Sequence, residues 1–180
     1  RPLLCQLNLD LRDPRLGLQH EPFTRLPLLY CWTCNIAYEP FFYRLRADHS
    51  VTLLQYGRGR GAVAFTFEQV PVSFPEQPVE LVPVSEQQMH TIACLNRGET
   101  DFSSDEFTPP PEHQVGGFPL LEQGWEAYHL HCPACRRAMP FLAVIRNGAF
   151  AADIFTHGCI DIGYSYCPGC RVVGAVHNCD

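Results

Sequence analysis

Three pairs of cysteines, each with two residues between them, constrain this 180-residue chain more than any other feature. The pairs are Cys31/Cys34, Cys132/Cys135 and Cys167/Cys170. Two sulfurs at this spacing can turn inward from one tight loop and supply half of a tetrahedral metal site. Two such loops complete the site, so a metal is expected to hold part of this chain together.

The two C-terminal pairs carry the stronger form of the pattern. In both, a proline follows the first cysteine and an arginine follows the second, which favours a tight turn beside a cation. Arginine and backbone N–H groups would offset the negative charge of a four-thiolate zinc centre. Because four thiolates leave no open coordination position, the site is expected to be structural. The predicted zinc ligands are Cys132, Cys135, Cys167 and Cys170; buried free thiols are the alternative.

The first pair, Cys31/Cys34, encloses the bulky Trp32 and Thr33 and has neither proline nor glycine in the turn. In a strand, residues three apart point to opposite faces, which would separate the two sulfurs. Two packed thiols and a second metal site both remain open. The other cysteines and the histidines are too scattered in the sequence to complete a particular second site.

Composition narrows the class of protein. Hydrophobic residues make up 46% of the chain and aromatic residues 12%, as expected for a globular protein. The net charge of −6 argues against a nucleic-acid-binding surface, and no apolar run is long enough to span a membrane. The cysteine pairs are spaced as in zinc knuckles, which are tight Cys-x-x-Cys loops, and no signal segment is visible. Both features predict that the cysteines are thiolates in a cytoplasmic protein. All 13 basic residues are arginine, which indicates a bacterial source.

The pattern of apolar residues predicts a mostly β or α+β fold with antiparallel sheets and little helix. The expected strands cover residues 3–11, 26–32, 41–45, 51–56, 62–67, 141–146, 160–166 and 172–176. For the first of these, a short helix is the alternative. Residues 70–83 contain four prolines and are expected to form an extended surface segment or an edge strand. The polar residues 97–112 suggest a boundary between an N-terminal β-rich lobe, 1–112, and a C-terminal zinc-ribbon-like lobe, 113–180; one continuous domain is the alternative.

Two further segments bear on function. His113-Gln-Val-Gly-Gly-Phe-Pro119 is predicted to form a tight turn, because its two glycines permit positive φ. It lacks the lysine and the following helix of a phosphate-binding loop. No nucleophile elbow, metalloprotease motif or carboxylate pair suggests an active site, so the chain is predicted not to be an enzyme.

The order of these motifs resembles the bacterial YwqG-like family. The similarity rests on the His113 to Pro119 segment, on Cys132-Pro-Ala-Cys135 followed by Met139-Pro-Phe-Leu142, and on Cys167-Pro-Gly-Cys170, within residues 113–176. The family is distantly similar to programmed-cell-death-protein-2-like proteins, which act as chaperones of a ribosomal protein. The resemblance implies a β-rich, cytosolic and non-enzymatic protein.

The leading functional hypothesis is therefore a zinc-stabilised module that binds another polypeptide, in the manner of a chaperone or an antitoxin-like immunity protein. The alternative is a metal-dependent hydrolase or a thiol-redox enzyme that uses Cys31 and Cys34. A redox Cys-x-x-Cys motif normally starts a helix in a strand–helix–strand unit, and apolar β-like runs surround the pairs here.

Overall fold

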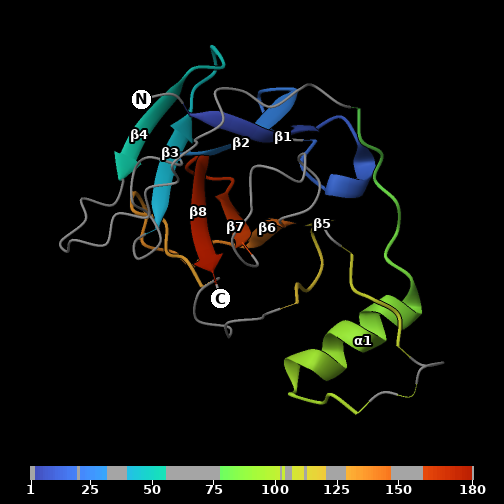
Figure 1. Ribbon diagram of the computed structural model, residues 1–180. Helices are drawn as coiled ribbons and strands as arrows, with labels where there is room; N and C mark the ends of the chain where they lie inside the picture. The colour runs from blue at the N-terminus through green and yellow to red at the C-terminus, as the bar shows by residue number, and fades with distance from the viewer. Residues whose placement is uncertain are drawn as a thin grey trace, which may run out of the picture.

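The computed structural model describes residues 3–19, 21–31, 40–55, 78–101, 103, 107–111, 113–120, 129–146 and 160–179. Their secondary structure is mostly β with antiparallel sheets, which confirms the predicted fold class (Figure 1). The strands are β1 (Leu4–Asp10), β2 (Arg25–Tyr30), β3 (Phe41–Leu45), β4 (Val51–Gln55), β5 (His113–Val115), β6 (Phe141–Arg146), β7 (Ile160–Cys167) and β8 (Val172–Cys179). A short 3-10 helix, η1 (Pro14–Leu16), and one α-helix, α1 (Glu86–Asn96), complete the described elements.

A six-stranded sheet with the order β4-β3-β8-β7-β6-β5 forms the centre of the molecule (Figure 1). Each neighbouring pair in it is antiparallel. The pairing of β3 with β8 joins the first half of the chain to its C-terminal region, because Phe41 lies opposite Ala175 and Arg44 opposite Val172. One sheet therefore contains strands from both sides of residue 112.

The small sheet formed by β1 and β2 packs against one face of the large sheet. Every second side chain along a strand points to the same face of the sheet. In β3, Phe41, Tyr43 and Leu45 point to the face that packs against the small sheet. Two buried tyrosines connect the sheets. The Tyr43 hydroxyl donates to Pro27 O at 2.6 Å and accepts from Leu29 N at 2.9 Å.

The second connection depends on an irregularity in β1. The β1–β2 register shifts between Cys5 and Leu7, and Gln6 at this shift is buried. The Tyr164 hydroxyl of β7 donates to Gln6 Oε1 at 2.5 Å. A bulge can redirect a side chain, and here it allows a polar group of β1 to satisfy a buried hydroxyl of the large sheet.

The opposite face of the large sheet carries a second, smaller cluster of buried residues. Phe42 of β3 and Val172 of β8 pack there with Leu130, Met139 and two of the cysteines. Gly174 makes this packing possible, since a Cβ atom at this position would lie 2.7 Å from Leu130 Cδ1 and 2.8 Å from Phe42 Cε1. The cysteine-containing segments therefore lie directly on β3 and β8.

Helix α1 was not predicted from the pattern of apolar residues, because its polar and apolar residues are poorly segregated. A capping box nevertheless marks its start: Ser85 Oγ accepts from Gln88 N, and Gln88 Oε1 accepts from Ser85 N, both at 3.1 Å. This Ser-x-x-Gln pattern was the signal available in the sequence. Figure 1 shows α1 apart from both sheets, and Asn96 Nδ2 ties its last turn to Pro119 O at 2.9 Å.

The strands predicted near 3–11, 26–32, 41–45, 51–56, 141–146, 160–166 and 172–176 are all present. The strand predicted for 62–67 lies outside the described residues. Of the segment predicted for 70–83, residues 70–77 lie outside the described residues, whereas 78–83 are neither helix nor strand and are mostly exposed. The predicted Gly-Gly turn follows β5, and both Gly116 and Gly117 have positive φ, at 68° and 69°.

Candidate metal centre

Four cysteine sulfurs from two distant parts of the chain converge on one point. The Sγ atoms of Cys132, Cys135, Cys167 and Cys170 all lie within 4.8 Å of one another. Those of Cys135 and Cys167, on different loops, are 3.8 Å apart. A tetrahedral centre with Zn–S bonds of about 2.3 Å requires sulfurs about 3.8 Å apart, so the arrangement fits a metal of this size.

Both knuckles share one backbone geometry. Arg136 follows Cys135 with φ 61°, and Arg171 follows Cys170 with φ 55°. In each, a backbone N–H points back into the turn: Arg136 N donates to Cys132 O at 2.7 Å, and Arg171 N donates to Pro168 O at 3.2 Å. A left-handed residue directly after the second cysteine reverses the chain, so both sulfurs of a pair face the same side.

The sheet positions the two knuckles. The second knuckle is the turn between β7 and β8, so the strands hold Cys167 at the last position of β7. The first is closed by Cys132 N donating to Arg137 O at 2.9 Å and Met139 N donating to Leu130 O at 2.8 Å. Its base packs on Phe42 and Val172.

Arg137 supplies the positive charge at the sulfur cluster. Its backbone N–H and its guanidinium both bond to the Cys135 sulfur and lower the pKa of that thiol to about 6. The thiols of Cys135, Cys167 and Cys170 in turn raise the pKa of Arg137. The guanidinium also lies against the second knuckle, since a Cβ atom on Gly169 would be 3.4 Å from Arg137 Nη2.

The predicted charge compensation is therefore made by a different arginine from the one expected. Arginine directly after each knuckle was the signal in the sequence, but Arg136 and Arg171 occupy the left-handed positions of the turns. Arg137, one residue further along, reaches the sulfurs. Only the direction in which the turn leaves the knuckle decides which of two consecutive arginines faces the cluster.

At two of the four cysteines, the surroundings disfavour a charged sulfur unless a cation is bound. Burial raises the pKa of Cys167 to about 12, and the neighbouring Cys135 together with burial raises the pKa of Cys170. Cys132 exposes only 1% of its surface. A divalent ion would reverse this balance, because a coordinated thiol is deprotonated outright. The donor set of four sulfurs, two of them buried, fits a soft or borderline metal such as zinc.

Four histidines lie near the knuckles in the sequence: His129, His131, His157 and His177. His177 is buried and packs edge-on against Tyr30, with ring centroids 5.8 Å apart. Burial lowers its pKa to about 4. His129 and His131 are exposed on the segment before the first knuckle. His157 lies outside the described residues. Among the described residues, the set of metal-ligating groups that converges contains cysteines alone.

Cys31 is buried, with 1% of its surface exposed, and its sulfur is disulfide-bonded. In this state it is neither a free thiol nor a metal ligand. The prediction for Cys34 lies outside the described residues. Cys5 is exposed and Cys94 is buried in α1; neither forms a disulfide, and neither joins the four-cysteine cluster.

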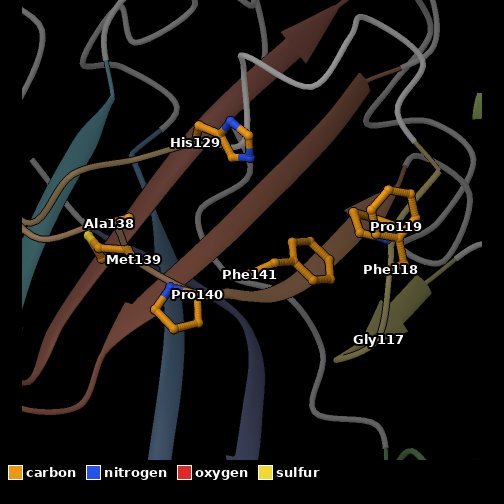
Figure 2. Close-up of a pocket in the computed structure, with 8 residues that line it drawn as sticks. All are labelled: Gly117, Phe118, Pro119, His129, Ala138, Met139, Pro140 and Phe141. Atoms are coloured by element: carbon orange, nitrogen blue, oxygen red, sulfur yellow. The ribbon is translucent and has the colours of Figure 1, made fainter.

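A pocket beside the first knuckle was not predicted. Residues 117–119 of the Gly-Gly turn form one side of it, and residues 138–141 form the other, with His129 above them (Figure 2). The cavity has a volume of about 350 Å³ and a mostly apolar lining. Two motifs that are separate in the sequence, the Gly-Gly turn and the stretch after the first knuckle, therefore meet at one pocket.

Within the described residues, no helix is both long and apolar enough to cross a membrane. Comparisons with protein-family models, curated proteins and solved structures found no match to this chain.

Proposed function

We propose that this chain is a zinc-stabilised protein-interaction module without catalytic activity. The observation that carries the proposal is the convergence of four cysteine sulfurs within 4.8 Å, on two knuckles that lie against the large sheet. Four thiolates saturate a tetrahedral ion, so zinc here would stabilise the fold and would not activate water or substrate.

The proposal also includes the protein family of the chain and its location in the cell. The order of the Gly-Gly turn, the Cys-Pro-Ala-Cys and Cys-Pro-Gly-Cys knuckles is the basis for placing the chain with the bacterial YwqG-like proteins, in the cytoplasm. A chaperone-like or immunity-like role would require a surface for another polypeptide. The apolar pocket between residues 117–119 and 138–141 supports such a role, because it adjoins the knuckle that the metal would hold in place.

Replacement of a ligand tests the metal site directly. Cys132→Ser and Cys167→Ser should each abolish stoichiometric zinc and strongly destabilise the protein, because metal binding and folding are coupled. The measurements are metal content by mass spectrometry and thermal unfolding, with Cys5→Ser as the matched control at an exposed cysteine outside the cluster. Full stability of the two variants, or a wild-type chain purified without any bound metal, would contradict a structural zinc site.

Protein binding needs a separate experiment. The zinc-loaded chain, at native abundance in its host, should cross-link to a defined polypeptide, and Phe118→Glu in the pocket should reduce that cross-link. Leu53→Glu, at an exposed position of β4, is the control. If the chain retains its zinc but cross-links to no protein, the result would contradict the interaction role and would not affect the proposal of a zinc site.

The enzyme alternative is weaker on the same observations. A thiol-redox function would use Cys31 and Cys34, and reactive thiols are accessible to their substrates. Cys31 exposes 1% of its surface, which favours a structural disulfide. A hydrolase would need an open coordination position at the metal, and four cysteines leave none.

A further inference from the structure

The two knuckles expose their sulfurs unequally, and in the same way. In each knuckle the first cysteine is buried and the second is partly exposed. Cys132 exposes 1% of its surface and Cys167 exposes 5%, whereas Cys135 and Cys170 are only partly buried. Oxidation of cysteine follows exposure and thiolate character. A small oxidant that reaches the cluster from solvent therefore meets Cys135 and Cys170 before the buried pair.

Arg137 distinguishes Cys135 from Cys170. The backbone N–H and the guanidinium of Arg137 both bond to the Cys135 sulfur. The Cys170 sulfur interacts with the sulfurs of the other three cysteines. When a peroxide oxidises a thiolate, the oxygen that leaves carries a negative charge, and guanidinium N–H groups stabilise such a developing anion. This contact makes Cys135 the favoured point of attack.

A second sulfur lies within reach of Cys135. The Sγ atoms of Cys135 and Cys167 are 3.8 Å apart and belong to different knuckles. Because the sulfurs of a disulfide are about 2.0 Å apart, only a small movement of the two knuckles would join them. Cys167 is shielded from solvent but lies beside the sulfur that would be oxidised. A partly exposed cysteine next to a second, resolving cysteine is the usual arrangement of a reversible thiol sensor.

We infer that Cys135 is a modification site for hydroperoxides, and that its oxidation leads to a disulfide with Cys167 and to the release of zinc. First, the Cys135 thiolate attacks the terminal oxygen of the hydroperoxide. An S–O bond forms and the O–O bond breaks, which gives Cys135 sulfenic acid and an alkoxide or hydroxide. Next, the Cys167 thiolate attacks the sulfenic sulfur, so that an S–S bond forms and hydroxide leaves. Two electrons pass from the two thiolates to the peroxide, and the released oxyanions take protons from water.

This inference rests on the proposed zinc site and adds a way to regulate it. The disulfide consumes two of the four ligands, so Cys132 and Cys170 alone would no longer saturate a tetrahedral ion. Residues 138–141 follow the first knuckle directly and form one wall of the pocket (Figure 2), so the redox state would also act on that wall. Reduction of the disulfide by a dithiol would restore all four thiolates.

The first test treats the full zinc-loaded chain with hydrogen peroxide. A chromophoric chelator measures released zinc, and mass spectrometry of a digest maps the disulfides. Zinc and the Cys135–Cys167 disulfide should appear in equal amounts, and a dithiol reductant should restore zinc binding. No release of zinc, or a new disulfide confined to one knuckle, would overturn the inference.

A second test removes the proposed point of attack and keeps a full set of ligands. In Cys135→His, three sulfurs and an imidazole still form a complete tetrahedral zinc set, but the imidazole cannot form a sulfenic acid. This variant should hold zinc without peroxide and should lose most of the peroxide-dependent release. Cys5→Ser, at an exposed cysteine outside the cluster, should release zinc as the wild type does. Equally fast release from Cys135→His would overturn the inference.

A third test keeps all four cysteines and replaces the cation. Arg137→Gln should slow the release by peroxide by about tenfold, the usual effect of a group that contacts a metal ligand. Both proteins are compared at a pH at which they hold their zinc. Arg136→Gln is the control, because Arg136 is exposed at the left-handed position of the turn. Equal rates for the two variants would contradict the selection of Cys135 by Arg137.

Metal analysis before the addition of peroxide separates this inference from the proposed function. A reduced chain that is purified without any metal would contradict the structural zinc site and, with it, the switch. A chain that holds zinc but does not release it to the chelator after peroxide treatment would contradict the switch alone.

Discussion

Arg137 and His177 show how single side chains acquire properties that their sequence neighbours do not reveal. Arg137 contacts a cluster of thiols and so raises the fraction of thiolate available to a metal. His177 is buried beside Tyr30 and is held neutral by desolvation. Both effects depend on segments that are distant in the sequence, and both make the protein sensitive to pH.

Arg137→Gln should make the metal centre release zinc at a higher pH. Protons compete with zinc for the sulfurs, so zinc is lost as pH falls. Without the Arg137 charge the pKa of Cys135 rises, and the release midpoint should move up by on the order of half a pH unit, since a nearby opposite charge shifts a pKa by about 1–3 units. A chromophoric chelator measures release. Arg136→Gln is the matched control, and equal midpoints for the two variants would refute the role of Arg137.

His177→Phe should reduce the loss of stability in mild acid. The folded-state pKa of His177 is about 4, below the ordinary 6.5, so its neutral form contributes stability above pH 6.5 that is lost as pH falls toward 4. Unfolding of the wild type in urea should therefore lose about 2 kcal/mol more than the variant between about pH 7.5 and 5. The phenyl ring keeps the edge contact with Tyr30. Identical pH dependence in both proteins would show that His177 does not contribute.

At the level of the strands, a glycine in β8 allows another segment of the chain to pack closely on the large sheet. Gly174 of β8 lies opposite Phe42 in the register of β3 and β8, and Leu130 occupies the space above it. This notch allows the segment before the first knuckle to approach the sheet. The two halves of the sulfur cluster can then meet, because the second knuckle is the turn between β7 and β8.

Gly174→Ala should destabilise the zinc-loaded protein by about 1–3 kcal/mol, the usual cost of an extra methyl group in a packed core. Its Cβ atom would lie 2.7 Å from Leu130 and 2.8 Å from Phe42. Urea unfolding gives the free energy. Leu130→Ala in the same chain should relieve part of the clash, so the double variant should lose less than the sum of the single losses. Strict additivity would show that the two residues do not compete for this space.

Across the whole molecule, two sheets are joined by buried hydroxyl groups as well as by apolar packing. Tyr43 bridges Pro27 and Leu29 of β2, and Tyr164 reaches Gln6 of β1. Burial raises the pKa of both tyrosines, so they remain neutral donors at physiological pH. These bonds orient the small sheet on the large one, since buried polar groups pair only in one arrangement.

Tyr43→Phe should lower the free energy of unfolding by about 1–3 kcal/mol, because Leu29 N–H and Pro27 C=O lose a buried partner. Tyr164→Phe should have a smaller effect of about 1 kcal/mol, since one bond to Gln6 is lost. Urea unfolding and hydrogen exchange in β2 measure the two effects. Unchanged stability of Tyr43→Phe would show that the Tyr43 hydroxyl does not help to hold the two sheets together.

The amino-acid sequence was sufficient to predict most strands and the two knuckles. Alternating apolar residues in 41–45 and the Cys-Pro-x-Cys spacing are local signals, and each reflects geometry within a few residues. Helix α1 was missed because its capping box is a weaker signal than apolar periodicity. The alternation predicts a strand but does not name its partner, so the pairing of β3 with β8 was not predictable.

The knuckles illustrate the same division. Their spacing predicts that two sulfurs turn together within each loop, which is a local property of the backbone. The meeting of the two loops depends on the β7–β8 turn, on the notch at Gly174 and on the position of Leu130. The identity of the charge-compensating arginine and the pocket beside Phe118 arise in the same way. Contacts between distant segments depend on how side chains pack and on the register of the strands. Local patterns in the sequence do not reveal either of these, so only the tertiary structure decides such contacts.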